Sequence, residues 1–330
     1  MLTVIGEGLI DVVRRPSGTE SHPGGSPLNV AIGLARLDHP VQFIGRYGDD
    51  PHGRMLTEHL RASGVLVPLP PDGTPTSVAT AELDHRGAAT YHFDLDWHLP
   101  DLRERLSGLL GATTLLHTGS IATVLEPGAD QVMAVVERAR PRATIGFDPN
   151  CRPTITTDPE AVRGRVERFV ALADVVKASD EDLAWLYPGV DPLDSARRWL
   201  RLGAPEGPAL VVVTRGSRGA WGVCADGEEQ LSPPAVRVAD TVGAGDSFMA
   251  ALLSGIVDRE LDGAQRRPEL RRLDAAELRR IMDFAARAAA VTVSRRGANP
   301  PTRAEVRAGA PAPSSGAPSA PAASTRGGAA

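Results

Sequence analysis

The residues best suited to chemistry stand in one short stretch, residues 240–247, which reads Asp-Thr-Val-Gly-Ala-Gly-Asp-Ser. Apolar residues recur after it at Phe248, Leu252 and Ile256, a spacing that predicts a helix with Asp246 in or just before its first turn. A helix start has unpaired N–H groups and a partial positive charge, so it attracts a phosphate. A carboxylate there can accept a proton from an attacking hydroxyl. The stretch therefore indicates phosphoryl transfer, while a helix N-cap after a glycine turn is the structural alternative.

Two familiar nucleotide-binding patterns are excluded. The chain has one lysine, Lys177, and it lies outside any loop of the Walker type. Residues 6–11 begin like a dinucleotide loop, but Asp11 replaces the third glycine and Glu7 would repel a pyrophosphate. Because a carboxylate accepts hydrogen bonds from hydroxyl groups, Glu7 suits a neutral polyol instead.

Composition excludes several classes of protein. With 330 residues, 42% of them hydrophobic, the chain can bury the core of one large α/β domain or two smaller ones. A net charge of −5 gives no basic surface for nucleic acid, and no apolar run reaches the roughly 20 residues of a membrane span. Two cysteines, Cys151 and Cys224, cannot build a disulfide framework. We expect a cytoplasmic protein without nucleic-acid or membrane partners.

Strand and helix patterns alternate along the chain, and these elements must hold the residues named above in place. Short β-rich runs alternate with helical patterns, which predicts a mostly parallel sheet with helices on both faces. The predicted strands are Leu2–Ile5, Val41–Ile44, Thr114–His117, Thr144–Asp148, Asp174–Lys177 and Ala209–Thr214. From residue 307 the composition changes to Ala, Pro, Ser and Gly without large apolar residues, which predicts a disordered tail over 307–330.

One segment has a different pattern. Residues 76–84 and 88–95 lack helical periodicity and flank a short turn, so they predict a hairpin. Together with the loop 12–22, this hairpin could form a small β-sheet lid that excludes water from a kinase site. An ordinary edge hairpin would have the same sequence pattern.

A second glycine turn precedes a helix near the N-terminus. Ser26 suits the N-cap and Pro27 the first helical position, and the apolar stripe begins at Val30. Asn29 could point its amide at a sugar hydroxyl or act as a solvated capping group.

These motifs together resemble the ribokinase-like (PfkB) sugar kinases, most closely the fructokinase-like members. Residues 240–246 resemble the C-terminal signature Asp-Thr-x-Gly-Ala-Gly-Asp, and the turn at 24–31 with glycines near 45–53 resembles the N-terminal signature. Residues 148–152 resemble a central Asp-x-Asn-x-Arg segment, and residues 214–219 resemble a Thr-x-Gly-x-x-Gly nucleotide loop. The resemblance implies a ribokinase-like three-layer α/β/α domain over 1–306, with a mostly parallel central sheet and lid segments near 12–24 and 75–97.

The resemblance also implies roles for single residues. Asp246 matches the catalytic base, and Gly243, Ala244 and Gly245 match the anion hole. The positions expected to contact substrate are Asp11, Gly24, Gly25, Asn29, Tyr91, Phe93 and Arg152. Those expected to contact ATP are Lys177, Ser179, Thr214, Gly216, Gly219, Gly243, Gly245 and Asn299.

The expected metal positions depart from the family pattern. The family often has Asn-x-x-Glu near Mg²⁺, and here Ser179 and Asp182 occupy those places. Asp182 could reach Mg²⁺ through water, or these residues could simply form a helix N-terminus. Asp240 matches the side chain of a monovalent-cation site, but Pro301 lacks a polar group there, so potassium dependence stays open.

The sequence therefore predicts a Mg-ATP-dependent sugar kinase that phosphorylates fructose. Ribose, 2-keto-3-deoxygluconate and a nucleoside remain alternative substrates. A regulator that binds sugar or nucleotide without catalysis is the alternative from another class of protein. Lids of this family often pair, which leaves a homodimer through the lid as an alternative to a monomer.

Overall fold

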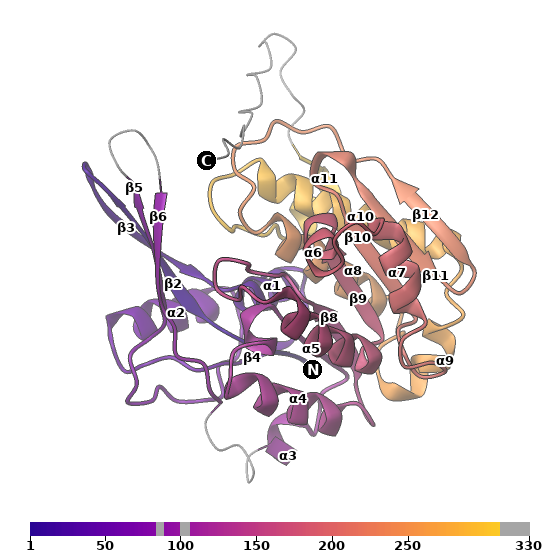
Figure 1. Cartoon of the computed structure of the whole chain (residues 1–330), viewed down its shortest axis with the longest axis horizontal. Coiled ribbons are helices and arrows are strands. Elements are labelled where there is room, and N and C mark those ends of the chain that lie inside the picture. Colours follow the sequence, from indigo (N-terminus) through magenta and orange to yellow (C-terminus); the bar gives the residue numbers. More distant parts are fainter. Residues whose placement is uncertain (84–88, 100–105, 311–330) are drawn as a thin grey trace.

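A computed structural model describes residues 1–83, 89–99 and 106–310. Its centre is an eight-stranded sheet (Figure 1). The strand order is β12-β11-β10-β9-β8-β7-β1-β4. The six strands from β10 to β4 run parallel, and β11 and β12 complete one edge as antiparallel strands. The strands are β1 (Leu2–Ile5), β4 (Val41–Ile44), β7 (Leu115–Gly119), β8 (Thr144–Asp148), β9 (Val175–Ser179), β10 (Leu210–Thr214), β11 (Ala220–Cys224) and β12 (Gly227–Leu231). All six strands predicted for this sheet are present, with small changes at their ends.

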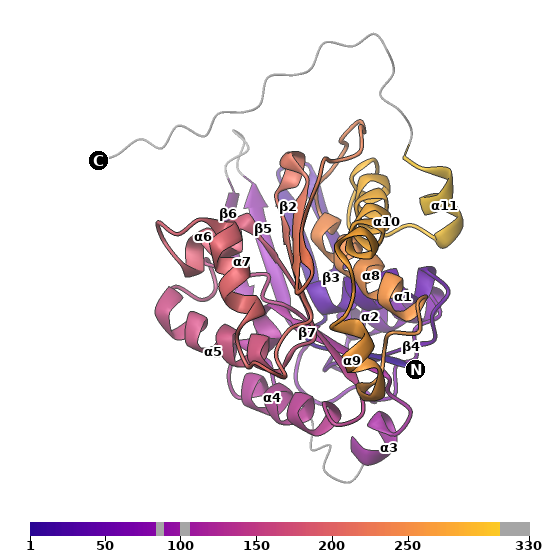
Figure 2. The same cartoon turned by 90° about the vertical axis from the view of Figure 1, so that its right-hand side faces the viewer.

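Helices cover both faces of this sheet, as Figure 2 shows in a view along the layers. Successive strand residues face opposite sides, so Val175 packs in one apolar cluster and Val176 in the other. The first face carries α1 (Ser26–Arg36), α2 (Pro51–Ala62), α8 (Ala244–Val257), α10 (Ala275–Val293) and α11 (Arg303–Ala308). The second carries α4 (Gly128–Ala139), α5 (Pro159–Leu172), α6 (Asp180–Leu186) and α7 (Pro192–Leu200). This arrangement is the predicted three-layer α/β/α domain.

The remaining helices are short. They are α3 (Leu106–Leu110) and α9 (Arg267–Leu270). Nowhere in residues 1–83, 89–99 and 106–310 does a helix have both the length and the apolar character needed to span a bilayer.

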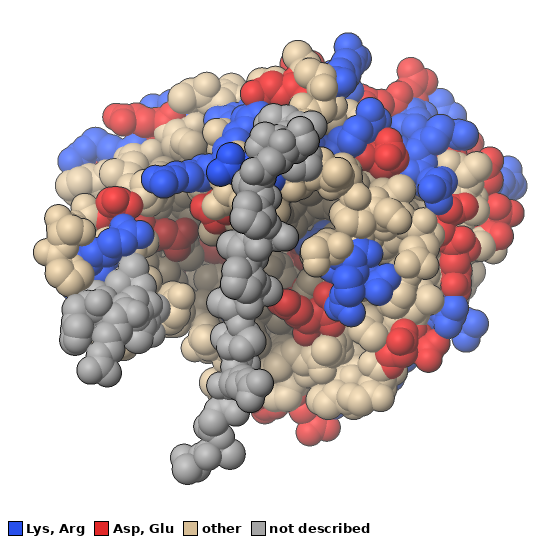
Figure 3. Space-filling view, turned by 90° about the horizontal axis from the view of Figure 1, so that it is seen from above, with Lys and Arg blue, Asp and Glu red and all other residues tan. Residues whose placement is uncertain are grey.

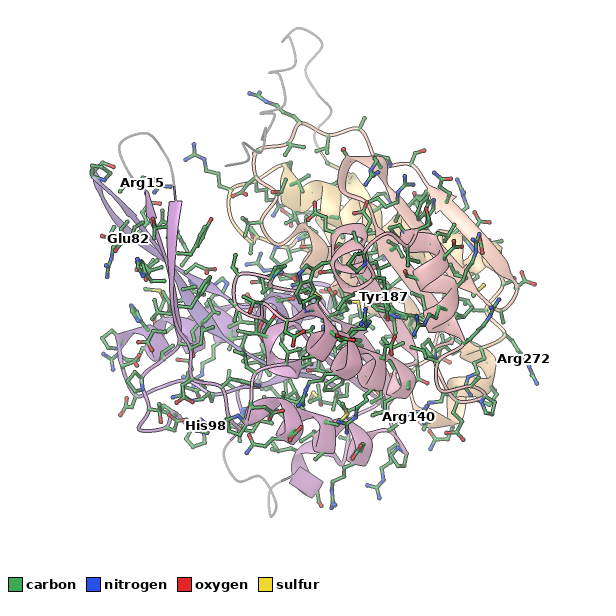
Figure 4. All side chains as sticks on the ribbon, in the orientation of Figure 1. Arg15, Glu82, His98, Arg140, Tyr187 and Arg272 are labelled. Atoms are coloured by element: carbon green, nitrogen blue, oxygen red, sulfur yellow. The ribbon has the colours of Figure 1, made fainter. Side chains whose placement is uncertain are left out.

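A second sheet of four strands projects from the large domain (Figure 1). Its order is β3-β2-β5-β6, with bounds β2 (Leu9–Arg15), β3 (Gly18–Gly24), β5 (Val78–Leu83) and β6 (Ala89–Asp94). Two antiparallel hairpins join through a parallel contact between β2 and β5. Figure 4 labels Arg15 and Glu82 on this sheet. The predicted hairpin and the loop before it therefore belong to one small sheet.

The predicted tail begins inside a helix. Helix α11 extends to Ala308, and the Gly309 N–H donates to the Glu305 carbonyl. The predicted boundary at residue 307 thus falls in the last turn of α11, because a capping box at Thr302 starts a helix that the alanine-rich composition did not reveal. Residues 311–330 of the predicted tail lie outside the described residues.

Candidate active site

The candidate site lies where the parallel strands end and two helices begin. In open α/β sheets, ligands bind outside the carboxyl ends of the strands. Here Ser120, directly after β7, and Asn150, two residues after β8, have positive φ angles of 55° and 36°. Such backbone strain in residues other than glycine gathers at functional sites. Figure 3 shows a recess on the face where the small sheet and the large domain meet.

Asp246 is the central carboxylate of this site. It lies in the first turn of α8, as predicted, and its residue is only 8% exposed. Oδ1 accepts a hydrogen bond from the Ser26 hydroxyl at 2.7 Å, and Oδ2 accepts one from Asn29 Nδ2 at 2.8 Å. Both donors come from the first turn of α1, so the N-termini of α1 and α8 meet at this carboxylate.

The role of Ser26 differs from the predicted N-cap. The cap position of α1 is Gly25, whose φ of 109° brings the chain close to the Glu7 carbonyl, where a Cβ would approach within 2.5 Å. The helix therefore begins one residue early, and the Ser26 hydroxyl points across to Asp246 instead of back to its own helix. A Ser-Pro pair is a common helix start, so the sequence pattern did not reveal this tertiary contact.

Asn29 retains a free acceptor. Because a carboxylate only accepts hydrogen bonds, Nδ2 must face Asp246 and Oδ1 must face away. Oδ1 is buried and has no hydrogen-bond partner among the described residues. A hydroxyl group of a bound sugar would satisfy this oxygen, which fits the predicted contact between Asn29 and substrate better than a solvated cap does.

The two glycines of the turn before α8 lie close to neighbouring groups. Gly243 is the N-cap of α8 with φ of 74°, and a Cβ there would lie 2.8 Å from the Ala298 Cβ. The Ala244 N–H closes the turn by donating to the Thr241 carbonyl at 3.3 Å. At Gly245 a Cβ would lie 3.1 Å from Lys177 Nζ. The turn therefore places helix N–H groups beside a cation.

Lys177 supplies that cation. Its amine forms a 2.7 Å ion pair with Asp148 Oδ2, and both side chains are almost completely buried. Burial lowers the pKa of the Lys177 amine, but the charges of Asp148 and Asp182 outweigh this effect and raise the pKa above its usual value. Lys177 is therefore protonated at neutral pH and lies under the glycine turn, where an anionic group would be attracted.

The small sheet presents one face to this region. Register places Asp11 opposite Ala79 and Ala79 opposite Phe93, so all three side chains lie on one face. Tyr91 is two residues before Phe93, and their rings stack with centroids 6.2 Å apart. Tyr91 is 58% exposed and Phe93 36% exposed, which leaves these rings available to a ligand.

Gly24 and Arg152 lie close to Asp11. A Cβ at Gly24 would come within 2.1 Å of Asp11 Oδ2, so glycine lets this carboxylate lie directly against the backbone. Arg152 Nη1 donates to Asn150 Oδ1 at 2.6 Å. Desolvation raises the pKa of the carboxyls of Asp11 and Glu7, and the charge of Arg152 partly offsets both increases. The predicted substrate residues are thus brought together.

Glu7 does not have the predicted role. It is 4% exposed, and its Oε2 accepts a hydrogen bond from the Ala122 N–H at 3.1 Å. Its carboxyl therefore joins the ends of β1 and β7 below the surface, where a polyol cannot reach it. The local glycine pattern suggested an open loop, but α1 and the end of β7 cover this position.

Four residues predicted to contact nucleotide lie at or after the ends of β10 and α10. Thr214 ends β10, and its hydroxyl donates to the Ala178 carbonyl at 3.4 Å. Gly216 and Gly219 have φ of 53° and 87° in the next loop, and a Cβ at Gly219 would lie 1.9 Å from the Leu231 carbonyl oxygen. Asn299 follows Ala298, the residue that touches Gly243. The loop that carries Asn299 therefore borders the glycine turn.

The two predicted metal positions already have backbone partners. Ser179 and Asp182 form the capping box of α6, and Asp182 Oδ1 also accepts a hydrogen bond from the Cys151 N–H at 2.7 Å. Asp240 accepts hydrogen bonds from the N–H groups of Val242 and Gly297 at 3.0 and 2.8 Å. Within the part of the chain that the structure describes, no three His, Cys, Asp or Glu side chains are grouped as a metal site.

Comparisons with known proteins agree with this arrangement. A family model described as pfkB family carbohydrate kinase matches residues 1–305. A fructokinase of Rhizobium leguminosarum bv. trifolii is 33% identical over 294 residues, which cover 84% of this chain and 86% of that protein.

Two solved structures have a similar fold. A fructokinase from Xylella fastidiosa with bound ATP has a TM-score of 0.82 at 26% identity, covering 93% of this chain and 97% of that one. A double-mutant fructokinase from Vibrio cholerae O395, with fructose, ADP and a potassium ion, has a TM-score of 0.73 at 26% identity and the same coverage. The resemblance and the fold predicted from the sequence motifs are both confirmed. The chain belongs to the pfkB family of carbohydrate kinases.

Proposed function

We propose that this carbohydrate kinase transfers the γ-phosphoryl group of ATP to a hydroxyl group of fructose. The position of Asp246 carries the proposal, because its carboxylate lies in the first turn of α8 and is held by Ser26 and Asn29. The Rhizobium relative is a fructokinase, and the Vibrio structure contains fructose and ADP. These names favour fructose over ribose, 2-keto-3-deoxygluconate and a nucleoside.

In this mechanism, Asp246 accepts the proton of the attacking hydroxyl group. The two hydrogen bonds from α1 hold the carboxylate in one orientation, which is what a general base needs. The N–H groups of Gly243 and Gly245 and the charge of Lys177 lie on the adjacent side, where they would stabilise negative charge on the transferred phosphoryl group. Asp11, Tyr91 and Phe93 would hold and cover the sugar from the small sheet.

We also propose which residues would hold Mg²⁺ and a potassium ion. Mg²⁺ usually keeps several waters and binds one or two carboxylates together with nucleotide phosphates, so it does not need a cage of protein ligands. Asp182, near the Asp148–Lys177 pair, fits contact through water because its oxygens already accept backbone hydrogen bonds. When bound, Mg²⁺ would offset phosphate charge. Asp240 is the proposed side chain at a potassium site, as the potassium ion in the Vibrio structure suggests.

The test is ADP release from Mg-ATP with fructose, ribose, 2-keto-3-deoxygluconate and adenosine as acceptors. We expect turnover with fructose, and an Asp246→Asn variant should lower kcat by about 10²- to 10⁴-fold without a change in melting temperature. Asp283→Asn, which changes a side chain 51% exposed on α10, is the matched control and should keep normal turnover.

Three other results would contradict parts of this proposal. Normal turnover by Asp246→Asn would remove Asp246 from the role of base. Turnover with another acceptor would replace fructose as substrate. Binding of sugar and ATP without any ADP release would favour a regulator of the same fold.

We also propose that the protein is cytoplasmic and that two copies pair through the small sheet. Cys151 and Cys224 are unpaired, which agrees with a reducing cytoplasm. Pairing of two copies through the small sheet is tested by sedimentation, with a monomer as the contrary result.

A further inference from the structure

Arg36, the last residue of α1, connects this helix to the loop that carries Asn299. Its guanidinium Nη1 donates to Asn299 Oδ1 at 2.5 Å and to the Pro300 carbonyl at 2.7 Å. The guanidinium is partly buried, so these hydrogen bonds are shielded from water more than surface contacts are. No sequence motif singled out Arg36.

Helix α1 is itself fixed in place against α8. At its N-terminal end, Ser26 and Asn29 donate to Asp246. In its middle, a Cβ at Gly33 would lie 2.7 Å from the Ala250 Cβ, so the two helices pack in close contact. Arg36 therefore projects from a helix whose position relative to the catalytic carboxylate is fixed.

The loop that Arg36 holds lies along the glycine turn. The Gly297 N–H donates to Asp240 at 2.8 Å, before the turn. The next residue, Ala298, would touch any side chain at Gly243. Asn299 is thus one residue beyond the contact with Gly243 of the proposed anion hole.

The hydrogen bond from Arg36 determines which way the Asn299 amide faces. A guanidinium group can only donate, so the oxygen of the amide must face Arg36 and Nδ2 must face away. Among the described residues no group accepts a hydrogen bond from Nδ2, and Asn299 is partly exposed. The amide therefore presents two N–H donors and no acceptor to its free side.

We propose that Arg36 is a positioning residue of the nucleotide site, which holds the Asn299 amide so that its N–H groups meet an acceptor atom of the base. The inference rests on the proposed function, because it takes the ligand beside the glycine turn to be ATP. Arg36 would strengthen binding of the base and would not affect binding of the phosphates. The same helix thereby positions the catalytic base at one end and the nucleobase contact at the other.

The test compares a nucleotide with a ligand that has phosphates but no base. Isothermal titration calorimetry would measure the Kd of ATP and of inorganic tripolyphosphate, with Mg²⁺, for the full chain and for Arg36→Met. Loss of one charge-assisted contact should raise the Kd of ATP about 10-fold. The Kd of tripolyphosphate and the KM of fructose should stay unchanged, and Arg36→Lys should restore part of the ATP affinity.

Arg61→Met is the matched control, since Arg61 is exposed at the end of α2 and its loss changes net charge equally. Unchanged ATP affinity in Arg36→Met would overturn the inference. An equal loss for ATP and tripolyphosphate, or a similar increase in the KM of fructose, would also overturn it, because Arg36 would then support the whole helix. Failure of the wild-type chain to bind ATP would instead contradict the proposed function.

Discussion

Single residues hold the site together through hydrogen bonds to Asp246 and close packing at the glycine turn. A substitution of one side chain would disrupt these contacts. Asp246 is held by two donors from another helix, and the turn before it has glycine where a methyl group would collide. Gly243 combines a left-handed backbone with direct contact to Ala298. Since a residue other than glycine costs about 1 kcal/mol in this conformation, backbone strain and collision add at this position.

Gly243→Ala should lower kcat strongly and reduce the melting temperature slightly. The added methyl group must move either the turn, which displaces its N–H groups from the phosphate position, or residue 298, which disturbs the loop packed against the turn. Steady-state kinetics and thermal melts measure the two effects. Gly64→Ala is the control, because Gly64 has a similar φ of 79° but open space around it. Equal activity of the two variants would contradict the proposed anion hole.

At the scale of elements, the ends of neighbouring strands are joined by buried polar side chains. Glu7 follows β1, and its carboxyl accepts a hydrogen bond from Ala122 in the 3₁₀ turn Ser120–Thr123 after β7. Burial raises the pKa of the Glu7 carboxyl to about 7. The folded protein therefore binds a proton here that the unfolded chain releases near pH 4.5.

This difference predicts a pH-dependent stability. Between about pH 4.5 and 7 the folded state holds more protons than the unfolded state, so the free energy of unfolding decreases as pH rises. Glu7→Gln cannot titrate, so the stability of wild type relative to this variant should fall by roughly 3 kcal/mol at most across that range. Urea denaturation at pH 5, 6, 7 and 8 would measure it.

Other titrating groups do not obscure this comparison. Burial lowers the pKa of His117 to about 3, which acts in the opposite direction, but this group is present in both proteins and its effect cancels. Glu58→Gln, at an exposed position on α2, is the matched control because it makes the same exchange away from a buried site. A profile for Glu7→Gln that does not vary with pH would mean that Glu7 has an ordinary pKa.

At the scale of the whole molecule, the small sheet is attached to the large domain by a buried arginine. The Arg46 side chain is 2% exposed and binds both carboxylate oxygens of Asp72, at 2.7 and 3.0 Å. It also donates to the carbonyls of Pro75 and Asp96, which lie just before β5 and just after β6. The connections at both ends of the hairpin therefore converge on one side chain.

The other end of the chain should be dispensable only beyond α11. Removal of residues 311–330, which include no large apolar side chain, should leave the melting temperature and kcat unchanged. Truncation after Thr302 should lower the melting temperature, because it also removes Val306, which is fully buried, and the ion pair between Arg303 and Asp258. Thermal melts of both truncations test this difference. Loss of stability in the shorter deletion would assign the tail a structural role.

Local sequence patterns predict the fold class, which is confirmed, and name many residues of the candidate site. Strand runs such as Val41–Ile44 and the helix after Asp246 depend on local periodicity, which is encoded in neighbouring residues. The glycine turns could also be predicted from the sequence, because positive φ and close backbone approach favour glycine at those positions. The order of these motifs along the chain then indicated the pfkB family.

Which side chains meet depends on packing between segments that lie far apart in the sequence. Ser26 appeared to be a helix cap and Glu7 a sugar contact, yet one binds Asp246 and the other is buried against Ala122. The partner of Arg36 lies 263 positions away in the chain. Local patterns carry no information about such pairs, because packing of α1 against α8 and the order of the parallel strands bring them together.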